Sequence, residues 1–326
     1  MPWRALAPRA WPAPRLRLRL VKAAPPPDWE SLLALADAQA PTLARAFLAA
    51  LTWEDLPSDV RQALLAGNGV QAAALLTLHV ETQINALYSP AVHQVAESLL
   101  RGVAIQQWDT LREMLRGLEV PSPIPTKLPG DLLAPRAIAA LYRDGLRRVQ
   151  GINTTTMEAL RPPLIEGIAQ GIPTPRIARE LVPKIGLTTQ QARALDTYAE
   201  GLAGLPAEKR AARIERKAMQ LRRKRANLVA ITETLTALNS AVDTFWESAS
   251  GSVGLTPGTL KRFWLVTSDE RLCERCKPVP GLNMSGRDFG EAFQTPSGPA
   301  TRPPLHPRCR CVLLVRPSVL VPTGSS

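Results

Sequence analysis

Apolar residues recur every three or four positions along most of this 326-residue chain, a spacing that places them on one face of an α-helix. The pattern starts after the prolines at 25–27, where Asp28 stands in the position of a helix N-cap. Further helices are expected to begin at Ser58 and Ser89, whose hydroxyls suit the same role. The stretch VPSPIPTKLP contains four prolines, so we predict a linker at 120–130.

A second array of helical patterns follows this linker. APRAIAALYRDGLRRVQGI is expected to form one helix. Thr155 and Glu158 have the spacing of a capping box and predict the start of the next helix, which Pro162 and Pro163 should kink or split.

Four more helical segments complete the array. Thr174-Pro175 opens one of them, and Thr188 with Gln191 predicts a second capping box. Together they resemble a helix-turn-helix around Gly186, although most such pairs are packing units. Two long helices are expected over about 206–220 and 221–249, joined through a run of charges.

The pattern changes after the small polar residues at 251–258. LKRFWLVTS and CVLLVRP read as strands, separated by glycine-rich turns. A module of this size buries little apolar surface and usually needs a cross-link. We therefore predict a mainly α protein in which helical N-terminal and central domains precede a small α+β Cys/His-rich C-terminal module. The predicted divisions are a basic arm at 1–27, an N-terminal helical domain at 28–119, the linker at 120–130, a central helical domain at 131–250, the Cys/His-rich module at 251–318 and a tail at 319–326.

Charge favours a polyanionic partner. Lys and Arg number 40 against 28 for Asp and Glu, a formal net charge of +12. This excess attracts nucleic acid, although a GC-rich genome that encodes Arg for solubility would also produce it. The first 27 residues carry basic side chains and no acid, and their prolines exclude the amphipathic helix of a transit peptide. We interpret them as a flexible basic arm.

The densest basic cluster lies in EKRAARIERKAMQLRRKRAN, which is expected to be helical. The residues predicted to contact nucleic acid or a portal are Arg210, Arg213, Lys217, Arg222, Arg223, Lys224 and Arg225. Arg210, Arg213 and Lys217 share a helix face by their spacing. Such a face can follow phosphates, pair with an acidic protein surface, or simply be solvated.

All four cysteines fall within one short C-terminal stretch. Cys273 and Cys276 form a C-x2-C knuckle, and His306, Cys309 and Cys311 form a second group. Zinc takes four such ligands, so we predict a structural zinc site of Cys273, Cys276, His306 and Cys309, with Cys311 as the alternative to His306. Two readings remain beside zinc: reduced cysteines packed in a small core, and two disulfides.

These residues also resemble a known family. RFWLVTSDERLCERCKPVPG and PPLHPRCRCVLL are similar to the signature of the phage Mu protein F-like, or phage head morphogenesis, minor head proteins. The matching positions are Trp264, Asp269, Cys273, Cys276, Gly281, Phe289, Pro303, Pro304, His306, Pro307, Cys309, Arg310 and Cys311. Upstream, the family's penultimate helix is matched at Thr232, Glu233, Thr234, Asn239 and Trp246, whereas Ile231 replaces its usual arginine.

The resemblance implies a minor capsid protein of the virion, located in the head interior or at the portal vertex after assembly in the host cytoplasm. It also implies contact with portal and other capsid proteins, and with double-stranded DNA without sequence preference, during assembly, packaging or ejection.

Other function classes find little support in the sequence. No apolar run has the 18 to 20 or so residues of a membrane span. Asp269, Glu270 and Glu274 lie near the cysteines, but no second histidine or nucleophile accompanies them, so we expect neither an enzyme nor a small-molecule substrate. The alternative function is a zinc-stapled nucleic-acid-binding regulator, free in the cytoplasm.

Overall fold

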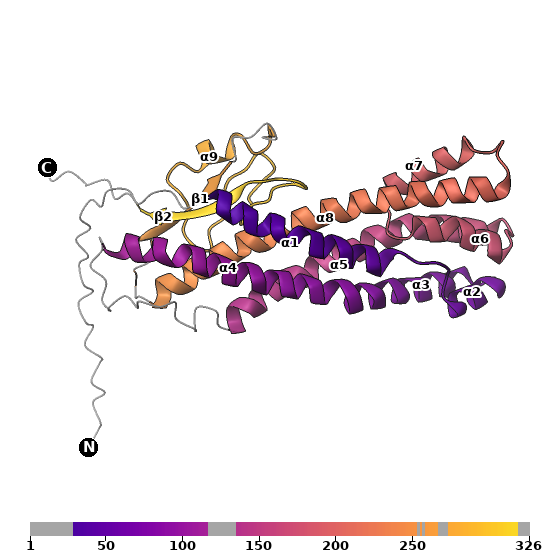
Figure 1. Ribbon diagram of the computed structural model, residues 1–326, viewed down its shortest axis with the longest axis horizontal. Helices are drawn as coiled ribbons and strands as arrows, with labels where there is room; N and C mark the ends of the chain where they lie inside the picture. The colour runs from indigo at the N-terminus through magenta and orange to yellow at the C-terminus, as the bar shows by residue number, and fades with distance from the viewer. Residues whose placement is uncertain (1–28, 117–134, 253–254, 256–257, 267–272, 319–326) are drawn as a thin grey trace, which may run out of the picture.

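The computed structural model describes residues 29–116, 135–252, 255, 258–266 and 273–318, and it is mainly α-helical, as predicted. Figure 1 shows an elongated bundle with a small two-stranded sheet at one end. The helices are α1 (Trp29–Leu51), α2 (Ser58–Leu65), α3 (Gly69–Gln83), α4 (Ser89–Arg116), α5 (Pro135–Ala169), α6 (Thr174–Leu181), α7 (Thr189–Glu200), α8 (Ala207–Ser252) and α9 (Val279–Leu282). Shorter elements are the π-helical turn η1 (Ile84–Tyr88), the 3-10 turn η3 (Val182–Lys184) and the strands β1 (Leu260–Leu265) and β2 (Val312–Pro317).

The helix α8 organises the molecule. It runs without interruption through the charge run where the sequence predicts two joined helices, and it packs against α1, α4, α5, α7 and β2. Most buried apolar residues of the two predicted helical domains belong to one core, and Leu187, Leu195 and Ala218 form a small second cluster. Within the main core, the rings of Phe47 and Tyr88 meet edge to face with centroids 5.9 Å apart. The helical regions therefore form one body around α8.

The prediction of a new helix at Thr155 is wrong. The helix α5 continues through Thr155, Pro162 and Pro163. The Thr155 hydroxyl donates to the carbonyls of Gly151 and Ile152 instead of capping a helix N-terminus. Packing of α5 against α3, α4 and α8 holds the helix together across the two prolines, because tertiary contacts outweigh local propensity.

The predicted serine caps are also not observed. Pro57 occupies the N-cap of α2 and no side chain caps that helix, so Ser58 is already helical. Ser89 joins η1 to α4 in αR conformation, where no free helix N-terminus needs a cap. The side chain of Asn68 instead accepts a hydrogen bond from the Gln71 N–H and caps α3.

Other local predictions are confirmed. Thr188 and Gln191 form the capping box of α7, and Thr174-Pro175 opens α6. Gly186 connects these helices with φ +80°, and a Cβ there would lie 2.9 Å from the Cβ of Leu51. Only glycine fits this turn, which lets the connection between α6 and α7 approach Leu51 at the end of α1.

Several predictions fall outside the described residues: the basic arm, the Asp28 cap, the linker at 120–130, Asp269 and the tail. Among the helices that the structure describes, none combines the length and apolar character of a membrane span.

Candidate metal centre

The C-terminal module is built on the two predicted strands. β1 and β2 pair antiparallel, with Leu260 opposite Pro317 and Trp264 opposite Leu313. Leu260, Arg262 and Trp264 point inward because successive strand residues alternate between faces. The rings of Trp264 and Phe293 pack edge to face at 5.4 Å. This small core is continuous with that of the helices.

Asn239 joins the module to α8. Its side chain is fully buried, and its Oδ1 accepts a hydrogen bond of 2.6 Å from the Leu313 N–H. Its Nδ2 donates to the carbonyl of Cys311 at 3.2 Å. One amide therefore fixes both the last cysteine and the start of β2 on the helix. Asn239 is one of the positions that carry the family resemblance.

Arg262 is a buried organising residue that the sequence reasoning missed. Only 2% exposed, it pairs with Asp243 of α8 at 3.2 Å and donates to the carbonyls of Asp288 and Thr301, both at 3.1 Å. Its guanidinium lies 5.3 Å from the centroid of the Phe293 ring. The alternation of LKRFWL, which gives Arg262 the same face as Leu260 and Trp264, was the available signal.

The five predicted ligands come together between two loops. The Nε2 of His306 lies 2.8 Å from Cys273 Sγ and 3.3 Å from Cys276 Sγ, and Cys276 Sγ lies 3.7 Å from Cys309 Sγ. The donor atoms form two overlapping groups that share Cys276, and within each group they lie within 4.8 Å of one another. All four cysteines are free thiols. The cluster could therefore hold a metal ion.

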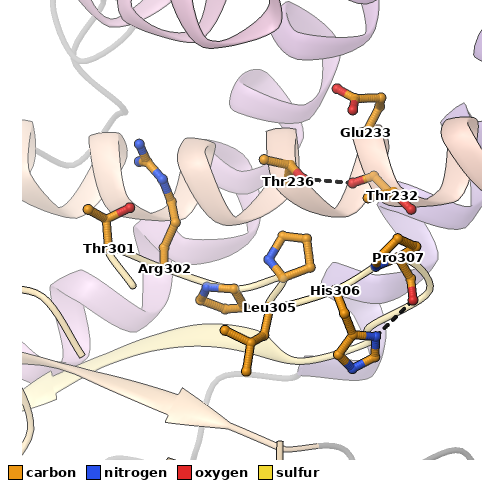
Figure 2. Close-up of a pocket in the computed structure, with 10 residues that line it drawn as sticks. Thr232, Glu233, Thr236, Thr301, Arg302, Leu305, His306 and Pro307 are labelled. Carbon is orange, nitrogen blue, oxygen red and sulfur yellow. Dashed lines mark hydrogen bonds between the residues drawn. The ribbon is translucent and has the colours of Figure 1, made fainter. Parts of the chain in front are cut away.

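His306 is oriented for this role by its own loop. The Nδ1 lies 2.8 Å from the carbonyl of Pro307, so Nδ1–H donates there and the Nε2 lone pair points at the sulfurs. Figure 2 shows this bond at the end of a cleft of about 600 Å³ between α8 and residues 301–307. The α8 side of this cleft is lined by Thr232, Glu233 and Thr236. The histidine is half-buried, whereas Cys276, Cys309 and Cys311 are buried.

The thiols have unequal acidity. A hydrogen bond from the Cys311 thiol lowers the pKa of Cys309 to about 5, despite burial, and the same bond raises the pKa of Cys311. Burial, with the neighbouring Cys309 thiolate, raises the pKa of Cys276 to about 12. Burial raises the pKa of Cys273, but N–H groups of its own turn lower it overall. Cys309 is thus the preformed thiolate, and Cys311 is its hydrogen-bond donor.

Two distances in the cluster can be compared with those of a tetrahedral thiolate-imidazole site, although the donors here fall in two groups of three that share Cys276. Two sulfurs bound to one metal at about 2.3 Å lie about 3.8 Å apart, close to the 3.7 Å between Cys276 and Cys309. The 2.8 Å between Cys273 and His306 is a hydrogen-bond length, and a bound metal would displace the proton that it holds. The buried indole N–H of Trp264 has no acceptor among the described residues. It lies beside Cys311, where it favours the thiolate form of that sulfur.

The predicted basic contact residues are only partly on the surface. Arg210, Arg213, Arg223 and Lys224 are exposed, and Lys217 lies over the Tyr198 ring at 5.5 Å.

Arg222 and Arg225 are buried, and their assignment to this surface is wrong. Arg222 donates to the carbonyls of Val182 and Ile185, both at 2.9 Å, where η3 ends. The Val182 carbonyl also accepts from the Ile185 N–H at 3.2 Å. Arg225 bonds Thr155, Thr156 and the carbonyl of Ile152, and its guanidinium lies 5.5 Å from the Phe47 ring.

No protein-family model, curated protein or solved structure matches this chain.

Proposed function

We propose that the Cys/His cluster binds zinc through Cys273, Cys276, His306 and Cys309, with Cys311 outside the metal as hydrogen-bond donor to Cys309. The observation that supports this set is the convergence of the His306 lone pair and two sulfurs on one point. Soft thiolates and imidazole suit zinc among the common metals. The other chemistry open to the cluster is a packed but metal-free core.

A zinc ion would act structurally here. Four protein donors complete its tetrahedral shell and leave no position for a reacting water. The metal would tie the loop at 273–276 to the loop at 306–309, which leads directly into β2. Since Asn239 attaches β2 to α8, the cross-link would set the angle at which the module stands on the helix bundle.

We infer a non-enzymatic role for the whole protein, as a minor head protein that contacts portal, other capsid proteins and DNA within a phage head. The support for this role is the resemblance of the module to the Mu F-like signature. A long rigid helix with exposed arginines at one end and a cross-linked module at the other also suits a part that bridges neighbours.

Two measurements test these proposals separately. Elemental analysis of the purified protein should give one zinc per chain, and a value well below one equivalent would contradict the zinc proposal. Sedimentation of lysates from phage-producing cells should place the protein with proheads and virions. A protein found only in the slow soluble fraction, bound to nucleic acid, would instead be the free regulator.

A further inference from the structure

A large groove lies at the opposite end of the molecule from the metal centre. It has a volume of about 1190 Å³ and runs between α2, α6 and the first turns of α8. These three elements gather at the end of the bundle far from β1 and β2 (Figure 1). Pockets for small molecules have typical volumes of about 300 to 1,000 Å³. The groove is therefore large enough for a segment of another polypeptide.

The groove has an apolar surface that the described residues leave uncovered. Ala207, Ala211 and Ile214 line it from α8, and their spacing of four and three places them on one helix face. Leu65 of α2 lines the other side and is 73% exposed. Small side chains along a helix allow a second helix to approach closely, so this face is shaped for helix packing.

Two arginines of the groove have no carboxylate partner among the described residues. Asp55 pairs with Arg61, Glu180 with Arg176 and Glu215 with the buried Arg222; these pairs cancel most of the charge. Arg179 and Arg210 form no ion pair with any described residue.

The helix ends add to this positive potential. The first turns of α2, α6 and α8 all line the groove, and neither α2 nor α6 has a side-chain cap. A helix N-terminus carries about half a positive charge. Glu54 is the one lining carboxylate for which the described residues offer no ion pair. The four arginines and four carboxylates of the lining cancel in number, so the positive sites beside the apolar side chains are the two arginines without an ion pair and the helix N-termini.

We propose that this groove binds an amphipathic helix of a partner protein, with small apolar residues against α8 and carboxylates beside Arg179 and Arg210. In this binding mode a helix lies in a groove, and apolar side chains one helical turn apart anchor it there. This proposal holds whatever the cellular role of the protein, because it rests on the opposite end of the molecule from the metal centre.

Other occupants fit the groove less well. Four carboxylates line it, and the continuous phosphates of a nucleic acid would meet them, whereas a helix can place its own charges selectively. The chain's own residues 1–27 carry basic side chains and no acid, so the unpaired arginines would repel them.

A displayed library of 20-residue helical peptides, selected against the full-length protein, tests the proposal. Enriched peptides should carry apolar residues one turn apart and an excess of Asp and Glu. The double variant R179E/R210E should weaken their binding by about tenfold or more. Ala211→Trp, which fills the groove without changing charge, should abolish it. Circular dichroism of both variants checks that the helices stay folded.

The matched control is R223E/K224E, which reverses two exposed charges on the same helix outside the groove lining. It should leave peptide affinity within about twofold. The proposal fails if no peptide is enriched, if the enriched peptides lack acidic residues, or if Ala211→Trp binds them normally. Binding of a 20-base-pair DNA duplex that R179E/R210E abolishes would also overturn it, in favour of a nucleic-acid groove.

Discussion

The two ends of α8 differ in how polar side chains are used. At the module end, the buried Asn239 and the half-buried Asp243 hold an irregular chain with little apolar surface of its own. At the groove end, apolar helix packing holds the structure, and most charges are exposed. Arg222 is an exception, because it is buried and donates to the carbonyls of Val182 and Ile185 where η3 ends. Asn239 and Arg222 therefore lie where regular backbone hydrogen bonding stops, whereas the buried Arg225 donates to the hydroxyls of Thr155 and Thr156 within α5.

Removal of Cys276, the cysteine shared by both donor groups, should have the largest effect, and the effect should be confined to the module end. Cys276→Ser should lose zinc and raise amide exchange across 273–318, while exchange in α1 to α7 stays unchanged. Structural zinc contributes on the order of 10 kcal/mol in zinc-finger peptides, so a small module depends on it. Hydrogen exchange with elemental analysis measures both effects.

Cys311→Ser is the matched control for that experiment. A serine hydroxyl can still donate to Cys309, so this variant should retain one zinc per chain. If Cys311→Ser lost zinc and Cys276→Ser retained it, Cys311 would be the metal ligand and the assignment of Cys276 would be wrong.

Removal of the amide that joins module and helix should come next. Asn239→Ala leaves the Leu313 N–H and the Cys311 carbonyl buried without partners, at about 1–3 kcal/mol each. We expect a loss of about 3 kcal/mol in the free energy of unfolding, measured in urea. The adjacent Ser240→Ala removes a buried hydroxyl that has no partner among the described residues, and it should be neutral or slightly stabilising. Equal effects of the two substitutions would contradict the role given to Asn239.

Adjacent arginines at the groove end should differ in the same way, more modestly. Arg222→Met keeps the apolar length but leaves the Ile185 carbonyl without its donor and the Val182 carbonyl with only the Ile185 N–H, so we expect a loss of about 2 kcal/mol. Arg223→Met changes an exposed side chain and should stay within about 0.5 kcal/mol of the parent. Urea unfolding gives the free energy of unfolding of both variants. A larger loss for Arg222→Met shows that burial, and not membership of the charge run, determines the contribution of each arginine to stability.

The smallest effect concerns protons released when metal binds. With its pKa near 12, Cys276 is protonated at pH 7 and must lose that proton to bind. Cys309, with a pKa near 5, is already a thiolate and releases none. Zinc affinity should therefore rise with pH around neutrality. Calorimetry in buffers of different ionisation enthalpy should show proton release, and an enthalpy independent of the buffer would contradict this assignment.

Local patterns determined much of this structure. Apolar spacing predicted the helical regions, alternation predicted both strands, and the knuckle spacing predicted which loops would meet. The Thr188 capping box also followed from sequence, because its hydrogen bonds join residues three positions apart. Each of these features depends on contacts within one element or on side chains with few alternative uses.

The sequence by itself thus determined a helical protein with a convergent Cys/His cluster. Only the tertiary structure decided which basic residues face solvent, since Arg222 and Arg225 donate to backbone carbonyls and threonine hydroxyls 37 to 73 positions away. It likewise kept α5 intact through Pro162 and Pro163, and it formed the groove from three segments distant along the chain. A periodic pattern shows which face of an element is apolar, but the segment that covers that face, or leaves it open, depends on the packing of the whole chain.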